Sequence, residues 1–177
     1  MAQFTAGTWQ IDPSHSEVGF TVRHLMSKVR GKFEEFEGQL VTDESGAGSV
    51  ANAKIQLSSV NTGTEDRDNH LRSSDFFSVD ETPVMTFQST GVRDKGDSFV
   101  AQGDLTIRGV TKPVELDVEV LGEGPDPWGG KRIGLEATTE ISRKEFGIDF
   151  NIPVSGDKVM IGDKVTIHLT VEAVHQG

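Results

Sequence analysis

The chain has 177 residues, of which 34% are hydrophobic and 25% charged, a composition typical of one folded domain over residues 1–177. A formal net charge of −11 disfavours binding to nucleic acid and to anionic membranes, which are themselves negatively charged. The absence of cysteine excludes disulfides, thiolate metal sites and a cysteine nucleophile.

The first residues, MAQFTAGTWQIDP (1–13), lack the basic and apolar regions of a secretory signal peptide. No apolar run approaches the roughly 20 residues of a membrane-spanning helix, so we expect no transmembrane segment. The chain as it stands predicts a cytoplasmic protein. A periplasmic or secreted location is expected instead if a signal peptide has been removed.

Apolar and polar residues alternate with period two in four segments, a pattern typical of antiparallel strands with one solvated face. In chain order these are EVGFTVRH (17–24), VELDVEVL (114–121), RIGLEATTEI (132–141) and KVTIHLTVEAV (164–174). Weaker candidates lie near 33–42, 50–57, 85–92 and 98–107. About eight short strands, separated in several places by Gly- and Asp-rich turns, predict an all-β sandwich or barrel.

Helices are expected to be few and short. TGTE (62–65) fits a capping box and predicts a helix that runs into RDNHLRSSDFF (67–77). SRKE (142–145) fits the same box and predicts one short turn, and HLMSKVRG (24–31) is a third candidate.

On a helix that starts near position 62, residues three and four apart share a face. Arg67, His70 and Leu71 then lie together, and Asp68 and Arg72 are spaced for an i,i+4 ion pair. Two phenylalanines, 76 and 77, follow in a predicted loop that plugs one end of the barrel or contacts a ligand tail.

Phe33 and Phe36, in FEEFEG (33–38), are interpreted as opposite-facing residues of one strand. One ring then points into the lumen and the other toward a helix or a partner chain. An exposed aromatic side chain of this kind is consistent with a dimer contact.

The motifs of common catalytic and metal sites are missing. The sequence has no G-x-S-x-G, S-x-x-K, H-E-x-x-H or phosphate-binding glycine loop. DPSHS (12–16) places Asp, Ser and His side by side, but it is more simply a turn, because catalytic triads are assembled in space. No two of the five histidines are three to five residues apart, although distant ligands could still converge. We therefore expect no catalytic residue, no metal ligand and no cofactor.

The predicted inward faces have small residues among large ones. Examples are the faces of 99–107 and 133–141, and 85–91 runs from large to small. An eight-stranded barrel holds either packed side chains or one small ligand. These faces therefore line an apolar tunnel, or Phe and Leu side chains fill the space. His24 continues the apolar face of its strand and either contacts a ligand or caps the strand end.

Five segments in order resemble the YceI-like proteins, also called polyisoprenoid-binding proteins. They are WQIDPSHSEVGFTVRHLM (9–26), VRGKFEEFEG (29–38), RDNHLRSSDFF (67–77), LTIRGVTKPVELDV (105–118) and ISRKEFGID (141–149). The resemblance implies an extended eight-stranded antiparallel β-barrel, similar to the lipocalins, with one or two short helices. It also implies an apolar tunnel that binds a long isoprenoid or other lipid, and a homodimer.

The residues expected to act in such a protein fall into two groups. The apolar tunnel is expected to be lined by Phe20, Val22, Phe36, Phe76, Phe77, Met85, Phe87, Phe99, Ala101, Leu105, Leu116, Leu135, Ile141 and Phe146. The lipid head group is expected near Arg23, His24, Arg67, His70 and Arg72. The leading hypothesis is lipid carriage, storage or sequestration. The alternatives are an enzyme using His24, His70 or DPSHS on a lipid-like substrate, and a haem or metal barrel ligated by His24 or His70.

Overall fold

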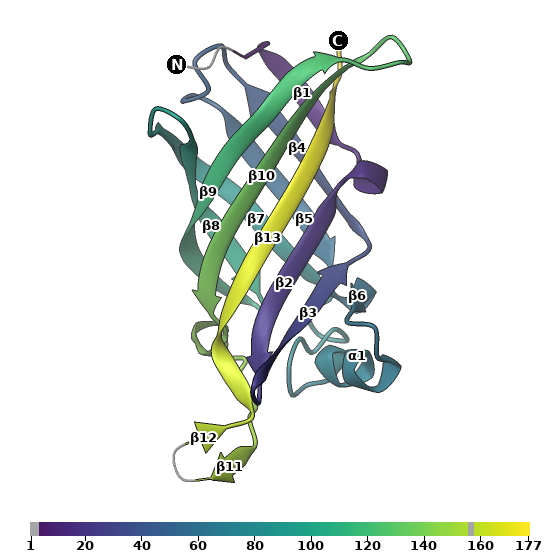
Figure 1. Cartoon of the computed structure of the whole chain (residues 1–177), viewed down its shortest axis with the longest axis vertical. Coiled ribbons are helices and arrows are strands. Elements are labelled where there is room, and N and C mark those ends of the chain that lie inside the picture. The colour runs from purple at the N-terminus through teal and green to yellow at the C-terminus, as the bar shows by residue number, and fades with distance from the viewer. Residues whose placement is uncertain (1–3, 156–157) are drawn as a thin grey trace.

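The computed structural model describes residues 4–155 and 158–177 and shows a long, closed antiparallel β-barrel (Figure 1). Eight strands form the closed barrel, in an order that ends with a pairing between the last strand and the first. Around the barrel they are β1 (Gly7–Ile11), β4 (Phe36–Thr42), β5 (Val50–Gln56), β7 (Val84–Asp94), β8 (Phe99–Ile107), β9 (Val110–Pro125), β10 (Lys131–Ser142) and β13 (Ile161–His175). The predicted all-β, eight-stranded barrel is confirmed.

Strand β13 has two different partners along one edge. Near its C-terminal end it pairs with β1, with Trp9 opposite His175. Nearer its N-terminal end it pairs with β2 (Glu17–His24), and β2 continues to β3 (Ser27–Phe33) and to the short β6 (Val60–Asn61). The barrel is thus closed by β1 at the upper end in Figure 1 and widened by β2, β3 and β6 at the lower end.

The remaining elements gather mostly at the lower end. Helix α1 (Glu65–Arg72) lies beside β3 and β6, and the small β11–β12 hairpin (Pro153–Ser155 and Lys158–Val159) projects below the barrel (Figure 1). Three 3₁₀ turns complete the described residues: η1 (Pro13–His15), η2 (Leu57–Ser59) and η3 (Arg143–Phe146). None of the described helices is long and apolar enough to cross a bilayer.

The core divides along the barrel axis. A lower cluster of buried residues surrounds Phe33, Leu57, Val60 and Phe146, and an upper cluster surrounds Trp9 and its neighbours on β10 and β13. The period-two alternation is observed as predicted. In β9, for example, Leu116 is buried while Glu115 and Asp117 are exposed.

The helix predicted for 24–31 is wrong. His24 ends β2 and residues 27–31 belong to β3, and Leu25 and Met26 form the tight turn between them, in which Leu25 has a left-handed backbone with φ of 56°. The register His24↔Ser27 leaves two residues for the turn. Strand pairing on both sides of the turn therefore overrides the weak helical pattern.

The two predicted capping boxes are also wrong, although the predicted helix (α1) and the predicted short turn (η3) both form. The N-caps are Thr64 for α1 and Ser142 for η3, and neither makes a side-chain cap hydrogen bond. The predicted ion pair of Asp68 with Arg72 does not form. Asp68 is buried and accepts hydrogen bonds from the backbone N and Oγ1 of Thr62, at 2.9 and 2.6 Å.

Phe33 and Phe36 do not belong to one strand. The first ends β3 and the second begins β4, with a bend between them. Phe36 is partly buried and packs against the lower core cluster. It is therefore not the exposed aromatic residue that was taken as consistent with a dimer contact.

Candidate functional site

The interior of the barrel contains two apolar cavities whose linings share no residue. The lower cavity has a volume of about 230 Å³ and lies between α1, the lower strands and the segment that follows η3. The upper cavity has a volume of about 160 Å³ and is lined by β5, β8, β9, β10 and their neighbours. Large side chains therefore do not fill the interior completely.

The single continuous tunnel that was expected is divided in the middle. Phe87 lines the upper cavity and also packs against the core cluster that surrounds the lower one. Its ring lies across Gly103, where a Cβ atom would overlap the ring. Leu105, buried in the lower cluster, pairs with Phe87 across β7 and β8. Phe87 and Leu105 therefore lie between the residues that line the upper cavity and the core cluster around the lower one.

Most of the expected tunnel residues line one cavity or the other. The lower cavity takes Phe20, Val22, Phe76, Phe77, Met85, Ile141 and Phe146. The upper cavity takes Phe87, Phe99, Ala101, Leu116 and Leu135. Leu105 and Phe36 line neither cavity and pack in the lower core cluster.

Three of the five expected head-group residues line the lower cavity, namely His24, Arg67 and His70. Arg23 does not, because it lies on the exposed face of β2 and donates to the backbone oxygen of Leu25. Arg72 does not either. It donates to the backbone oxygens of Ser58 and Val60 and so ties α1 to the segment before it.

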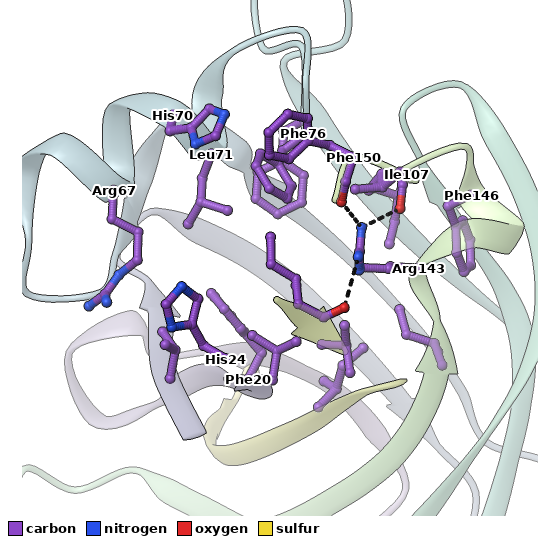
Figure 2. A pocket seen from close by; sticks show the side chains of 18 of the residues that line it. Phe20, His24, Arg67, His70, Leu71, Phe76, Ile107, Arg143, Phe146 and Phe150 are labelled. Atoms are coloured by element: carbon purple, nitrogen blue, oxygen red, sulfur yellow. Dashed lines mark hydrogen bonds between the residues drawn. The ribbon is translucent and has the colours of Figure 1, made fainter. Parts of the chain in front are cut away.

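Helix α1 presents one face to the lower cavity, as the sequence predicted. Figure 2 shows His70, Leu71 and Arg67 along this helix, with His24 across the cavity on β2. The Nε of Arg67 donates to Thr62 Oγ1 at 2.7 Å, and a terminal nitrogen donates to the Thr62 backbone oxygen at 2.8 Å. The loop before α1 therefore holds this guanidinium at the cavity wall.

His70 is held on two sides. Its Nε2 lies 2.8 Å from Asp75 Oδ2, and its ring packs edge-on against Phe76 and Phe150 with centroid distances of 5.0 and 4.9 Å. The carboxylate and the two rings fix the imidazole at the boundary between solvent and cavity. A ring held in this way is suited to contacting a polar group at the end of an apolar ligand.

Arg143 is the main cavity residue that was not predicted. It is only 5% exposed, and it donates to the backbone oxygens of Ile148, Phe150, Ile161 and Gly162 at 2.8 to 3.3 Å (Figure 2). Burial lowers the pKa of the Arg143 guanidinium, while the charges of Asp163 and Asp149 act in the opposite direction. The sequence analysis placed this arginine in the short turn predicted for SRKE and gave it no role in the site.

The lower cavity offers little for nucleophilic chemistry. Its lining contains no hydroxyl, thiol or carboxylate side chain and no lysine; its ionisable residues are His24, Arg67, His70 and Arg143. Among the described residues, no group of three or more His, Cys, Asp or Glu side chains is arranged to hold a metal ion. The arrangement is suited to enclosing an apolar chain with a polar end.

DPSHS lies away from both cavities and forms the predicted turn. Asp12 accepts from the backbone N and Oγ of Ser14, and His15 Nδ1 lies 2.7 Å from Asp12 Oδ2 on the surface. The hydrogen bond from Arg132, followed by those from Ser14 and His15, holds the pKa of Asp12 well below its ordinary value. The carboxylate therefore serves to stabilise the turn.

The chain is similar in sequence to known proteins over nearly its whole length. The sequence profile of the YceI-like domain matches residues 9–173. Protein YceI of Escherichia coli O157:H7 is 40% identical over 176 residues, which cover 97% of this chain and 88% of that protein.

Solved structures show the same barrel. The crystal structure of Burkholderia cenocepacia BcnA has a TM-score of 0.80 at 22% identity and covers 92% of this chain and 98% of its own. A polyisoprenoid binding domain from Saccharophagus degradans has a TM-score of 0.68 at 17% identity, with 97% and 99% covered. At these identities the likeness shows the fold alone.

Proposed function

Because this chain belongs to the YceI-like family, we propose that it binds a long-chain isoprenoid or a similarly apolar lipid inside the barrel. The bound lipid is carried, stored or sequestered without chemical change. The observation that carries the proposal is the pair of interior cavities with almost entirely apolar linings. The name of the Saccharophagus degradans domain supports the same class of ligand.

The energetics favour a ligand with a long chain. Burying each CH₂ group contributes about 0.8 kcal/mol, less the entropy lost in ordering the chain. Strand β10 has 12 residues, and a strand rises about 3.3 Å per residue, so the barrel wall is long enough to enclose several prenyl units. Affinity can therefore come from chain length, with few polar contacts.

The polar end of the ligand is proposed to lie at the lower cavity. Arg67, His70 and His24 can donate hydrogen bonds to a carbonyl, hydroxyl or phosphate group there. The opposite, apolar end then points toward the upper cavity, which it reaches when the Phe87 ring turns aside.

The test is to extract the purified protein with organic solvent and to identify released lipid by mass spectrometry. We expect wild-type protein to retain a prenyl lipid, and Arg67→Ala and His70→Ala to retain less. His168→Ala, at an exposed position of β13, is a matched control that should retain as much as wild type. A folded protein that releases no lipid and takes up no added prenyl alcohol would contradict the proposal.

An enzyme acting on a lipid-like substrate is a second candidate, favoured by the contact of Asp75 with His70 beside the same cavity as His24. A carboxylate that orients an imidazole is a common arrangement in general-base catalysis. Conversion of added prenyl lipid that is lost in His70→Ala would replace the carrier proposal with this one. A haem or metal barrel is tested by the visible spectrum and elemental analysis of the purified protein.

The homodimer and the cellular compartment are proposals that rest on family resemblance and on sequence. Sedimentation velocity at micromolar concentration tests the first, with a dimer expected. Fractionation of the source cells tests the second.

A further inference from the structure

The β2–β3 hairpin has a charge opposite to that of the chain as a whole. Residues 17–33 contain four cationic side chains and one acidic side chain, Glu17, although the net charge of the chain is −11. The four are Arg23, Lys28, Arg30 and Lys32, and all are exposed. We call them the hairpin cations. A local positive surface on an acidic protein indicates an anionic partner.

The arrangement of the hairpin cations does not favour folding. Arg23 lies directly opposite Lys28 in the strand register, and like charges in directly opposed positions destabilise a sheet. Among the described residues, none of the four takes part in an ion pair. Asp163, on the neighbouring β13, is engaged instead by Ser142 and by the backbone N of Lys144. The cations are therefore available to a partner.

The lower end also exposes apolar side chains. Met26 is fully exposed and Leu25 is 42% exposed at the hairpin turn, and Ile152 and Val154 are 43% and 52% exposed beside it. A hydrogen bond of 2.7 Å from Leu25 N to the Met160 backbone oxygen joins the two segments. We call these four apolar residues the lower tip. Together they form an apolar projection next to Arg23 and Lys28, while Glu65 and Asp66, exposed carboxylates of this end, lie on α1.

The lower tip adjoins the lining of the lower cavity. His24, which precedes the hairpin turn, lines the cavity, and so do Ile152 and Met160. The opposite end of the barrel also exposes apolar residues, among them Leu121 and Trp128. These lie on the β9–β10 hairpin with Glu119, Glu123 and Asp126. The two cations there, Lys131 and Arg132, are already ion-paired with Glu123 and Asp126, so they are less available to an anionic surface than the hairpin cations.

We propose that the lower tip docks on the surface of an anionic lipid bilayer. The apolar side chains insert among the lipid head groups, the hairpin cations contact lipid phosphates, and the lower cavity opens toward the bilayer. The net charge of the remainder then keeps the upper end directed away from the membrane. This inference goes beyond the proposed function, because bilayer contact requires no lipid inside the barrel.

The first experiment is co-sedimentation with vesicles of phosphatidylcholine alone and with added phosphatidylglycerol at about one third. We expect binding to the anionic vesicles only, weakened by added salt. Each basic residue near an anionic surface contributes about a fivefold gain in partition, so Lys28→Gln/Arg30→Gln should bind about 30-fold more weakly. Arg93→Gln/Lys95→Gln is the control, since it removes the same charge from the β7–β8 hairpin.

The second experiment locates the inserted end. Because the chain has no cysteine, Met26→Cys and Leu121→Cys each provide a single site for an environment-sensitive fluorophore. On anionic vesicles we expect a blue shift and quenching by brominated lipid at position 26 and neither at position 121. Equal binding to neutral vesicles, equal loss in the control variant, or quenching at position 121 would each overturn the proposal. Lipid extraction tests the proposed function independently of all three results.

Discussion

Arg143 shows that a charged residue can form part of the wall of an apolar cavity when its hydrogen bonds are directed elsewhere. Its N–H groups donate to the backbone oxygens of Ile148, Phe150, Ile161 and Gly162, and these bonds connect η3 to the start of β13. Sequence patterns could not reveal this role, because the acceptors are backbone groups that are brought together only in the fold. The residues predicted best, such as Phe20 and Val22, lie within regular strands.

Replacing Arg143 by methionine should destabilise the protein by at least about 3 kcal/mol, since several buried backbone oxygens lose their donor. Urea denaturation of both proteins measures the difference. Lys144→Met, at the exposed next residue, should change stability by less than about 0.5 kcal/mol. Equal stability of Arg143→Met and wild type would show that the guanidinium is not a structural tie.

Asp12 should make stability depend on acid pH. Its pKa in the folded state is held below the ordinary value of 3.8, chiefly by Arg132, so ionised Asp12 stabilises the fold above that value. This contribution is lost as the pH falls below 3.8. The stability difference between wild type and Asp12→Asn should shrink by about 1 kcal/mol between pH 5 and pH 3, measured by denaturant unfolding. Asp97→Asn, on an exposed hairpin, serves as the control. If the stability difference between wild type and Asp12→Asn is the same at pH 5 and pH 3, the prediction is wrong.

At the scale of elements, alternation predicted the long strands well because one face of each is buried and the other solvated. It failed where adjacent strands meet, as at Phe33 and Phe36, and where a two-residue turn replaced an expected helix at Leu25. The capping boxes failed for a different reason. The start of α1 is fixed by Asp68 reaching back to Thr62, a contact that depends on burial of the carboxylate.

The contact between β7 and β8 allows a direct test of the interior packing. A methyl group at Gly103 would overlap the Phe87 ring and lie 2.7 Å from the Gln88 backbone oxygen. Gly103→Ala should therefore destabilise the barrel by about 1–3 kcal/mol, measured by thermal or urea unfolding. Gly122→Ala, on β9 with open space around the added methyl, is the matched control and should be neutral or slightly stabilising. Similar effects of both substitutions would show that Phe87 moves aside freely.

At the scale of the whole molecule, the barrel and its apolar interior could be predicted, but the division into two cavities could not. Alternation tells which side chains point inward, whereas the free volume depends on how rings such as Phe87 cross the lumen. The change of partner along β13, from β2 to β1, could not be predicted either. The alternation of apolar and polar residues within a strand does not show which strands it pairs with.

A ligand that fills the interior should stabilise the entire barrel, because it binds the folded state and not the unfolded chain. At a free ligand concentration 100 times the Kd, the gain is about 2.7 kcal/mol, or roughly 5–10 °C in Tm for a protein of this size. Differential scanning calorimetry of delipidated protein with and without a long prenyl alcohol measures the shift. A short prenyl alcohol is the control and should give a smaller shift. The absence of any shift with the long alcohol would count against interior binding.

The double pairing of β13 has a consequence for the order of folding. Its partners β1 and β2 precede it in the chain and are translated before it, so neither can complete its hydrogen bonds until β13 has been synthesised. Contacts between distant parts of a sequence form slowly, and strand edges that wait for a partner are prone to aggregation. On the ribosome, the edges of the early strands therefore remain unpaired until β13 emerges. A chain truncated before residue 161 should aggregate and should not form a smaller barrel.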